Sequence, residues 1–240
     1  MPIVDAVRLP DELAELDLAE TNAVVIDILR ATSTIVAAIA SGASGVIPVG
    51  EVGHARAVSA QYPGSLLGGE RSAVKIEGFD LGNSPLEYTH EAVGGRVVVL
   101  STTNGTRAFE TVRSSPGVYA GALVNRAALC RALMDAQRDV LLVCSGTDGK
   151  VSEEDCFGAG LIADTLTGWG TLTDRAAGVR KKAMNDLGRL GDPARVIGSS
   201  FHGKRLIDLG LVADIEVCGR LDSSDVVPVM NAVGMLVAAG

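Results

Sequence analysis

Apolar runs rich in β-branched residues recur along the chain and alternate with Ala-rich stretches. The runs predict strands at residues 23–28, 45–49, 96–100, 117–123 and 139–144. The stretches between several of them have helical spacing, at residues 33–41, 51–61, 106–114 and 125–137. This strand, loop and helix rhythm predicts an α/β fold, a three-layer α/β/α arrangement around a largely parallel or mixed sheet.

The rhythm changes in two places. Residues 68–88, GGERSAVKIEGFDLGNSPLEY, have no clear period, and a loop this long inside a domain is usually functional. After Val151 the pattern is mostly helical up to about Leu209, and strand-like runs follow at 213–218 and 226–230. Because no low-complexity linker divides the chain, we expect a single domain over residues 1–240. Two similar α/β halves, about 1–138 and 139–240, stay open as an alternative.

Composition narrows the function classes. The formal charge of −8 leaves no basic stripe for a nucleic acid backbone, so an anionic small molecule would need locally placed cations or a metal. The four cysteines lack C-x-x-C spacing, which favours reduced thiols in the cytosol. The N-terminus has no signal-peptide pattern, and the uncharged segment 226–240 is too short and broken to span a bilayer. We expect a cytoplasmic protein without a membrane partner, with a homodimer as the default assembly.

Three loops that follow predicted strands carry similar polar residues. They lie within VVIDILRATST at 24–34, VVVLSTTNGTRAF at 97–109 and LLVCSGTDGKVS at 141–152. Hydroxyl residues at these places also cap helices, so capping alone is an alternative for each loop. Because strand C-termini in α/β sheets converge on a ligand crevice, the three loops together favour a shared site.

The loop at 101–107, STTNGTR, is the best candidate for an anion site. Backbone N–H groups at a helix start, with an arginine nearby, suit phosphate, sulfonate or carboxylate oxygens. Its candidate residues are Thr102, Thr103, Asn104, Gly105, Thr106 and Arg107. A capped helix with a solvated arginine is the alternative.

Acidic residues near the other loops point to a cation. Asp27 ends an apolar strand, where an unpaired carboxylate is costly to bury, so it needs either an ion pair with Arg30 or a divalent metal such as magnesium. In the irregular segment, Glu70 could join a metal site while Arg71 or Lys75 meets substrate charge; ordinary solvent contacts are the alternative.

The segment SEED contains another candidate. Ser152 and Asp155 match a capping box, but three adjacent acids exceed what capping requires, so Glu154 and Asp155 are candidates for metal binding or proton transfer. Cys144 is interpreted as a buried strand residue, because Lys150 stands where a Cys-x5-Arg phosphatase loop needs arginine. His202, in SSFHGKRL, is a candidate proton donor.

Taken together, several segments resemble one family. VVIDILRATST, LLGGERSAVKIEGFDLGNSPLEYT, STTNGTRAF, CSGT with SEEDCFGAG, and LGLVADIEVC look like the 2-phosphosulfolactate phosphatases, the ComB-like proteins, in order from about residue 22 to 228. The resemblance implies a magnesium-dependent phosphatase that converts 2-phospho-3-sulfolactate to 3-sulfolactate and inorganic phosphate in coenzyme M biosynthesis. It also implies a fold distinct from the haloacid dehalogenase class.

Chemistry applied to the matching segments gives hypothetical roles. The catalytic group comprises Asp27, Arg30, Arg107 and Glu154; the substrate-binding group comprises Arg71, Lys75, Thr102, Thr103, Asn104, Gly105 and Thr106; the Mg²⁺ ligands are Asp27, Glu70 and Asp155. The substrate class is a small phosphorylated anion. A broader phosphatase of 2-hydroxy-acid phosphates, or a non-catalytic protein that binds phosphorylated acids, stays open as an alternative.

Overall fold

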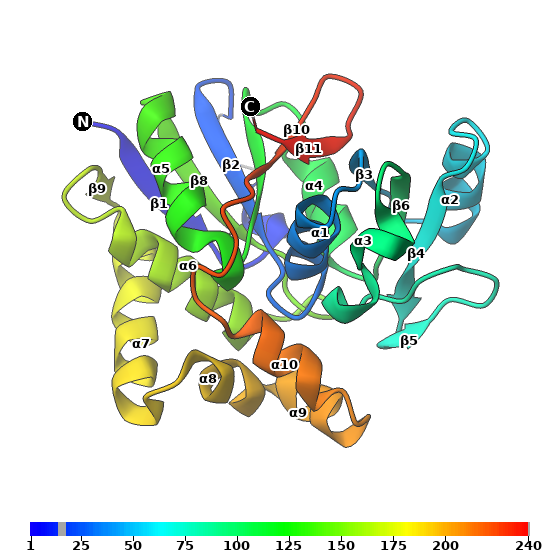
Figure 1. Ribbon diagram of the computed structural model, residues 1–240. Coiled ribbons are helices and arrows are strands. Elements are labelled where there is room, and N and C mark those ends of the chain that lie inside the picture. Colours follow the sequence, from blue (N-terminus) through cyan, green and yellow to red (C-terminus); the bar gives the residue numbers. More distant parts are fainter. Residues whose placement is uncertain (14–17, 240) are drawn as a thin grey trace.

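A computed structural model describes residues 1–13 and 18–239, and within them the strands form a single 11-stranded sheet. The order is β5-β4-β6-β3-β11-β10-β7-β2-β8-β1-β9 (Figure 1). The strands are β1 Ile3–Val7, β2 Thr21–Ile26, β3 Gly45–Pro48, β4 Leu66–Arg71, β5 Val74–Lys75, β6 Val97–Ser101, β7 Val118–Gly121, β8 Asp139–Cys144, β9 Thr171–Leu172, β10 Pro228–Met230 and β11 Leu236–Ala238.

Two groups of parallel strands are joined by a hairpin from the end of the chain. β4, β6 and β3 are parallel to one another, as are β7, β2, β8, β1 and β9. β10 and β11 lie between the groups and pair antiparallel with β7 and β3. The groups therefore run in opposite senses along the sheet. Residues at or just after the C-terminal ends of β4 and β6 in one group and of β2 and β8 in the other nevertheless line one cavity.

Helices cover both faces of the sheet. Val24 and Ile26 of β2 pack in one hydrophobic cluster with α5 (Arg126–Ala136) and α6 (Glu153–Thr165). Ala23 and Val25 pack in another with α1 (Ala31–Ala40) and α4 (Gly105–Thr111). This period-two alternation confirms the predicted three-layer α/β arrangement with a mixed sheet. The helices are α1 Ala31–Ala40, α2 Val52–Ser59, α3 His90–Val93, α4 Gly105–Thr111, α5 Arg126–Ala136, α6 Glu153–Thr165, α7 Asp174–Leu190, α8 Pro193–Ser199, α9 Phe201–Asp208 and α10 Val212–Cys218; 3-10 turns lie at Pro10–Leu13, Pro85–Glu87 and Leu123–Asn125.

The strand and helix predictions up to residue 144, and the strand near residue 228, are confirmed to within a few residues. The strand predicted at 213–218 is wrong, because this segment is helix α10. Its buried side chains are Asp214, Ile215 and Cys218, a spacing that places them on one helical face. The segment 68–88 is also more regular than expected, since it contains the end of β4, all of β5 and a 3-10 turn.

Strands from both ends of the chain share this sheet. β8 pairs with β1 and β2, and β9 extends the sheet beyond β1. The division near residue 138 stays a prediction. In the part of the chain that the structure describes, no helix has the length and apolar character needed to cross a membrane.

Candidate active site

A cavity of about 50 Å³ lies where the loops after β2, β4, β6 and β8 meet helix α9. Asp148 N donates to Asn104 Oδ1 at 3.2 Å, which joins the loop after β8 to the loop after β6. The cavity is lined by Asp27, Leu29, Arg30, Glu70, Ser72, Ala73, Asn83, Thr102, Thr103, Asn104, Thr147, Asp148, His202 and Arg205. The three similar loops noted in the sequence therefore share one site.

Asp27 is held at the junction of β2 and α1. Its carboxylate Oδ1 accepts from Ala31 N at 3.3 Å, and its backbone oxygen accepts from the Thr32 hydroxyl at 2.9 Å. The neighbouring hydroxyls of Ser33 and Thr34 donate to backbone oxygens at 2.9 Å. The hydroxyl-rich ATST segment thus fixes the loop, and the Asp27 carboxylate lines the cavity.

The charge of Asp27 is poorly compensated. The pKa of Asp27 is raised from its usual 3.8 to about 7. Burial is the main cause, and the nearby carboxylates of Glu70 and Glu154 add to it, while the Ala31 N–H and the Ser145 hydroxyl oppose it. Among the described residues, no lysine, arginine or histidine forms an ion pair with Asp27. The site therefore favours a cation beside Asp27 or a proton on it.

Glu70 connects β4 to the loop after β6. Its Oε1 accepts from the backbone N and the hydroxyl of Thr103, both at 3.0 Å, and its Oε2 accepts from Ala73 N at 2.7 Å. These bonds orient the carboxylate beside Thr103 in the cavity wall. Thr102, Thr103 and Asn104 are thereby brought to the cavity, as expected for the STTNGTR loop.

Gly105 allows α4 to approach α1 closely. A Cβ atom at this position would lie 2.5 Å from Asp27 Oδ2 and 2.7 Å from Ala31 Cβ, closer than real contacts. Thr106 is buried, and its hydroxyl donates to the Thr102 backbone oxygen at 2.9 Å. Both residues shape the site from behind its wall.

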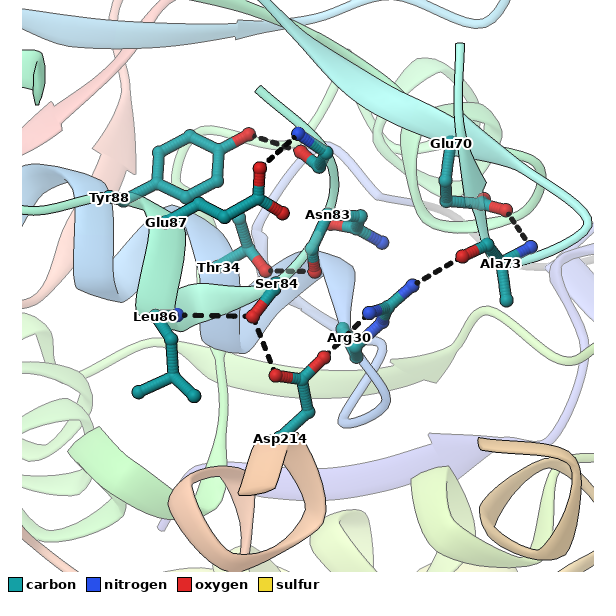
Figure 2. A network of polar contacts seen from close by, with 11 residues as sticks. Arg30, Thr34, Glu70, Ala73, Asn83, Ser84, Leu86, Glu87, Tyr88 and Asp214 are labelled. Atoms are coloured by element: carbon teal, nitrogen blue, oxygen red, sulfur yellow. Dashed lines mark hydrogen bonds and ion pairs between the residues drawn. The ribbon is translucent and has the colours of Figure 1, made fainter. Parts of the chain in front are cut away.

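Arg30 is paired with an acid from a distant part of the chain, Asp214 of α10. Nη1 of Arg30 lies 2.6 Å from Asp214 Oδ2, and both side chains are 3% exposed (Figure 2). Ser84 donates to the other oxygen of Asp214 at 2.5 Å, and Arg30 Nη2 donates to Ala73 O at 3.3 Å. The structural ion pair considered for Asp27 and Arg30 is thus made by Asp214 instead.

Glu154 and Asp155 lie behind the cavity and do not line it. Asp155 accepts from Ile28 N at 2.9 Å, Gly146 N at 3.1 Å and the Ser145 hydroxyl at 3.2 Å. The predicted capping box is wrong, because the Ser152 side chain makes no capping bond and the Asp155 carboxylate turns towards the loops after β2 and β8. In this geometry Asp155 positions those loops. The metal-binding role expected for Asp155 and the catalytic role expected for Glu154 stay predictions.

The structure does not bring three of the expected cations to the cavity wall. Arg71 donates to the backbone oxygens of Glu70, Gly50 and Ser101, and Arg107 is exposed on α4. Lys75 is exposed on β5. Their substrate roles stay predictions.

Two residues of α9 complete the wall. His202, the candidate proton donor, lies in the cavity; burial lowers its pKa, and the neighbouring charge of Arg30 lowers it further. Arg205 was missed, although SSFHGKRL contains it. The sequence around Arg205 gives no sign that α9 packs against the β4–β5 turn. That packing brings Arg205 to the site, where it donates to Ser72 O.

The side chains around the cavity meet some of the requirements of a magnesium site but not all of them. Within residues 1–13 and 18–239, no group of three or more His, Cys, Asp or Glu side chains is arranged to hold a metal. Two buried carboxylates without cationic partners, Asp27 and Glu70, do line the cavity. Because magnesium usually takes one or two carboxylates together with water and substrate phosphate, these two suffice for such a site.

The sequence of the chain matches a known protein family along the segments that carry the motifs noted above. Residues 7–232 match the model of the family described as 2-phosphosulpholactate phosphatase. The chain belongs to this family. The resemblance inferred from its motifs is confirmed, and every residue that lines the cavity falls within the matched range.

Relatives with the family's name span nearly the whole chain. A protein of Carboxydothermus hydrogenoformans named probable 2-phosphosulfolactate phosphatase is 41% identical over 228 residues, which cover 94% of this chain and 92% of that protein. Proteins with the same name are 42% identical over 225 residues in Caldanaerobacter subterraneus subsp. tengcongensis, covering 91% of each chain, and 37% identical over 232 residues in Nostoc punctiforme, covering 94% of each. The 2-phosphosulpholactate phosphatase family thus includes near full-length relatives.

Proposed function

We propose that this protein is a magnesium-dependent phosphatase that hydrolyses 2-phospho-3-sulfolactate to 3-sulfolactate and inorganic phosphate. The observation that carries the proposal is the family match over residues 7–232, which spans the entire cavity. The physical support is a small polar cavity that is lined by two buried carboxylates and two arginines.

The residues in and behind the cavity would have three different roles in this reaction. Asp27 and Glu70 would hold the ion, which when bound polarises a phosphoryl oxygen and lowers the pKa of bound water. The Thr102 to Asn104 segment supplies hydroxyl and amide groups for phosphoryl oxygens. Asp155 positions the loops that carry Asp27 and Gly146.

The test is phosphate release from 2-phospho-3-sulfolactate by the purified protein. We expect turnover with magnesium, loss of turnover with EDTA, and recovery when magnesium is restored. Binding without turnover would instead support a non-catalytic binding protein. Equal rates with phosphoglycolate, which lacks the sulfonate, would instead support a broader phosphatase.

A further inference from the structure

One wall of the cavity has buried polar atoms that the proposed phosphoryl chemistry does not use. Arg30 Nε, Asn83 Oδ1 and His202 Nδ1 have no hydrogen-bond partner among the described residues, and all three side chains line the cavity. Since roughly 90% or more of buried polar groups in proteins have a partner, three such atoms around one space point to a missing ligand. Arg30 and Asn83 are 4% and 5% exposed, so bulk water does not readily serve them.

A strained turn places a second arginine beside Arg30. Ser72 and Ala73, between β4 and β5, have φ values of 56° and 68°, in the left-handed region that non-glycine residues rarely adopt. Their consecutive carbonyl oxygens accept from Arg205 Nη2 and Arg30 Nη2, each at 3.3 Å. The turn therefore holds two guanidinium groups at the same wall of the cavity.

The charges on this wall are only partly balanced. Asp214 pairs with Arg30, as Figure 2 shows, but no carboxylate in the described part of the chain lies within ion-pair distance of Arg205. Two guanidinium groups repel each other, and an anion between them relieves that repulsion while giving each group an acceptor.

The same cavity also holds acidic side chains. Asp27 and Glu70 line it together with Thr102 and Thr103. Glu70 accepts from the N–H of Ala73, the residue whose carbonyl accepts from Arg30. A substrate with a phosphate at one end and a second anionic group on its carbon skeleton would suit a cavity that combines the proposed metal-binding carboxylates with two guanidinium groups.

We propose that Arg30, Asn83, His202 and Arg205 form a subsite for a non-reacting carboxylate or sulfonate group of the substrate. The Asn83 amide turns its N–H₂ towards the anion, an orientation reached by a 180° rotation about its last bond. The link to a substrate rests on the proposed function, whereas binding of the anion itself does not.

Binding of a small anion tests the subsite without catalysis. Sulfoacetate, which carries a sulfonate and a carboxylate but no phosphate, is titrated calorimetrically into the full chain in EDTA. We expect Arg205→Gln to weaken binding about tenfold or more. Lys204→Gln is the matched control, because Lys204 is the exposed neighbour on the same helix; we expect it to bind like the unaltered protein. Arg205→Lys, which keeps the charge but loses the guanidinium fork, should fall between them.

Further titrations with ethanesulfonate and propionate distinguish the two oxyanions. Stronger binding of ethanesulfonate assigns the subsite to the sulfonate, and stronger binding of propionate assigns it to the carboxylate. Failure of the unaltered protein to bind any of these anions, or equal binding by the Arg205→Gln and Lys204→Gln variants, overturns the proposal.

Kinetics separate this subsite from a phosphate site. We expect Arg205→Gln to lower the ratio of kcat/KM for 2-phospho-3-sulfolactate to kcat/KM for p-nitrophenyl phosphate by about tenfold. An equal fall for both substrates would place the arginines on the phosphoryl group and overturn the proposal. If the protein binds sulfoacetate through Arg205 but hydrolyses neither substrate, the proposed function fails and the subsite stands.

Discussion

The side chains of Arg30 and Asp214 form a buried ion pair of 2.6 Å although the residues are 184 positions apart in the chain. Arg30 follows β2, and Asp214 lies in the first turn of α10. The pair therefore fastens the C-terminal helical region to the loop that carries Asp27. Each partner has a further bond, to Ala73 O for Arg30 and from Ser84 for Asp214.

Removal of Asp214 should leave the Arg30 charge buried without compensation. We expect Asp214→Ala to lower the free energy of unfolding by about 3–5 kcal/mol, measured by urea denaturation in EDTA. Asp208→Ala, at an exposed position of α9, is the control and should change it by less than about 0.5 kcal/mol. An Asp214→Ala protein as stable as the control would show that the pair is not required for stability.

The raised pKa of Asp27 predicts a pH dependence in the metal-free protein. Because folding favours the protonated acid, its contribution to stability is full below the usual pKa of 3.8 and is lost as pH rises through about 7. The unaltered protein should therefore lose stability relative to Asp27→Asn between pH 4 and pH 8. Urea unfolding of both proteins in EDTA measures the difference, and a difference independent of pH would contradict the prediction.

Magnesium should stabilise the protein through Asp27 and Glu70. At a free concentration of 100 times Kd the expected gain is about 2.7 kcal/mol, seen as a rise in Tm. Asp27→Asn and Glu70→Gln should abolish most of this rise. Asp155→Ala should instead lower Tm in EDTA and keep the rise with magnesium, because Asp155 holds backbone N–H groups. Loss of the rise in Asp155→Ala alone would reverse these assignments.

The close approach at Gly105 predicts that even one methyl group disturbs the site. Gly105→Ala would press a Cβ atom against Asp27 and Ala31, and we expect it to destabilise the protein by about 1–3 kcal/mol and to reduce phosphatase activity. Gly188→Ala is the matched control, since that position in α7 is exposed and has no neighbour within 4 Å of the new Cβ. There the substitution should stabilise by about 0.5–1 kcal/mol.

The sequence predicted the part of the site that local pattern determines. Asp27 and the Thr102 to Asn104 loop each follow a buried strand, and in α/β sheets the C-terminal ends of strands carry ligand-binding residues. That these two loops meet although β2 and β6 run in opposite senses was not predictable from the strand pattern. The apolar runs also predicted the central strands, because their periodicity reports burial directly.

Long-range packing was beyond what local pattern could predict. Asp214 lies in VADIEVC, a short β-branched segment that reads as a strand until its helical face is seen packed near Arg30. Asp155 has the spacing of a capping residue, yet distant backbone N–H groups compete successfully for its carboxylate. Arg205 and His202 reach the cavity only through the placement of α9.

The position of the β10–β11 hairpin has a consequence during synthesis. β3 and β7 are made early, but the strands that pair between them come from residues 228–238. Until those residues leave the ribosome, β3 and β7 each present an unpaired edge, the kind of surface that recruits strands from other chains. The two groups of parallel strands can therefore form one continuous sheet only after residues 228–238 have been made.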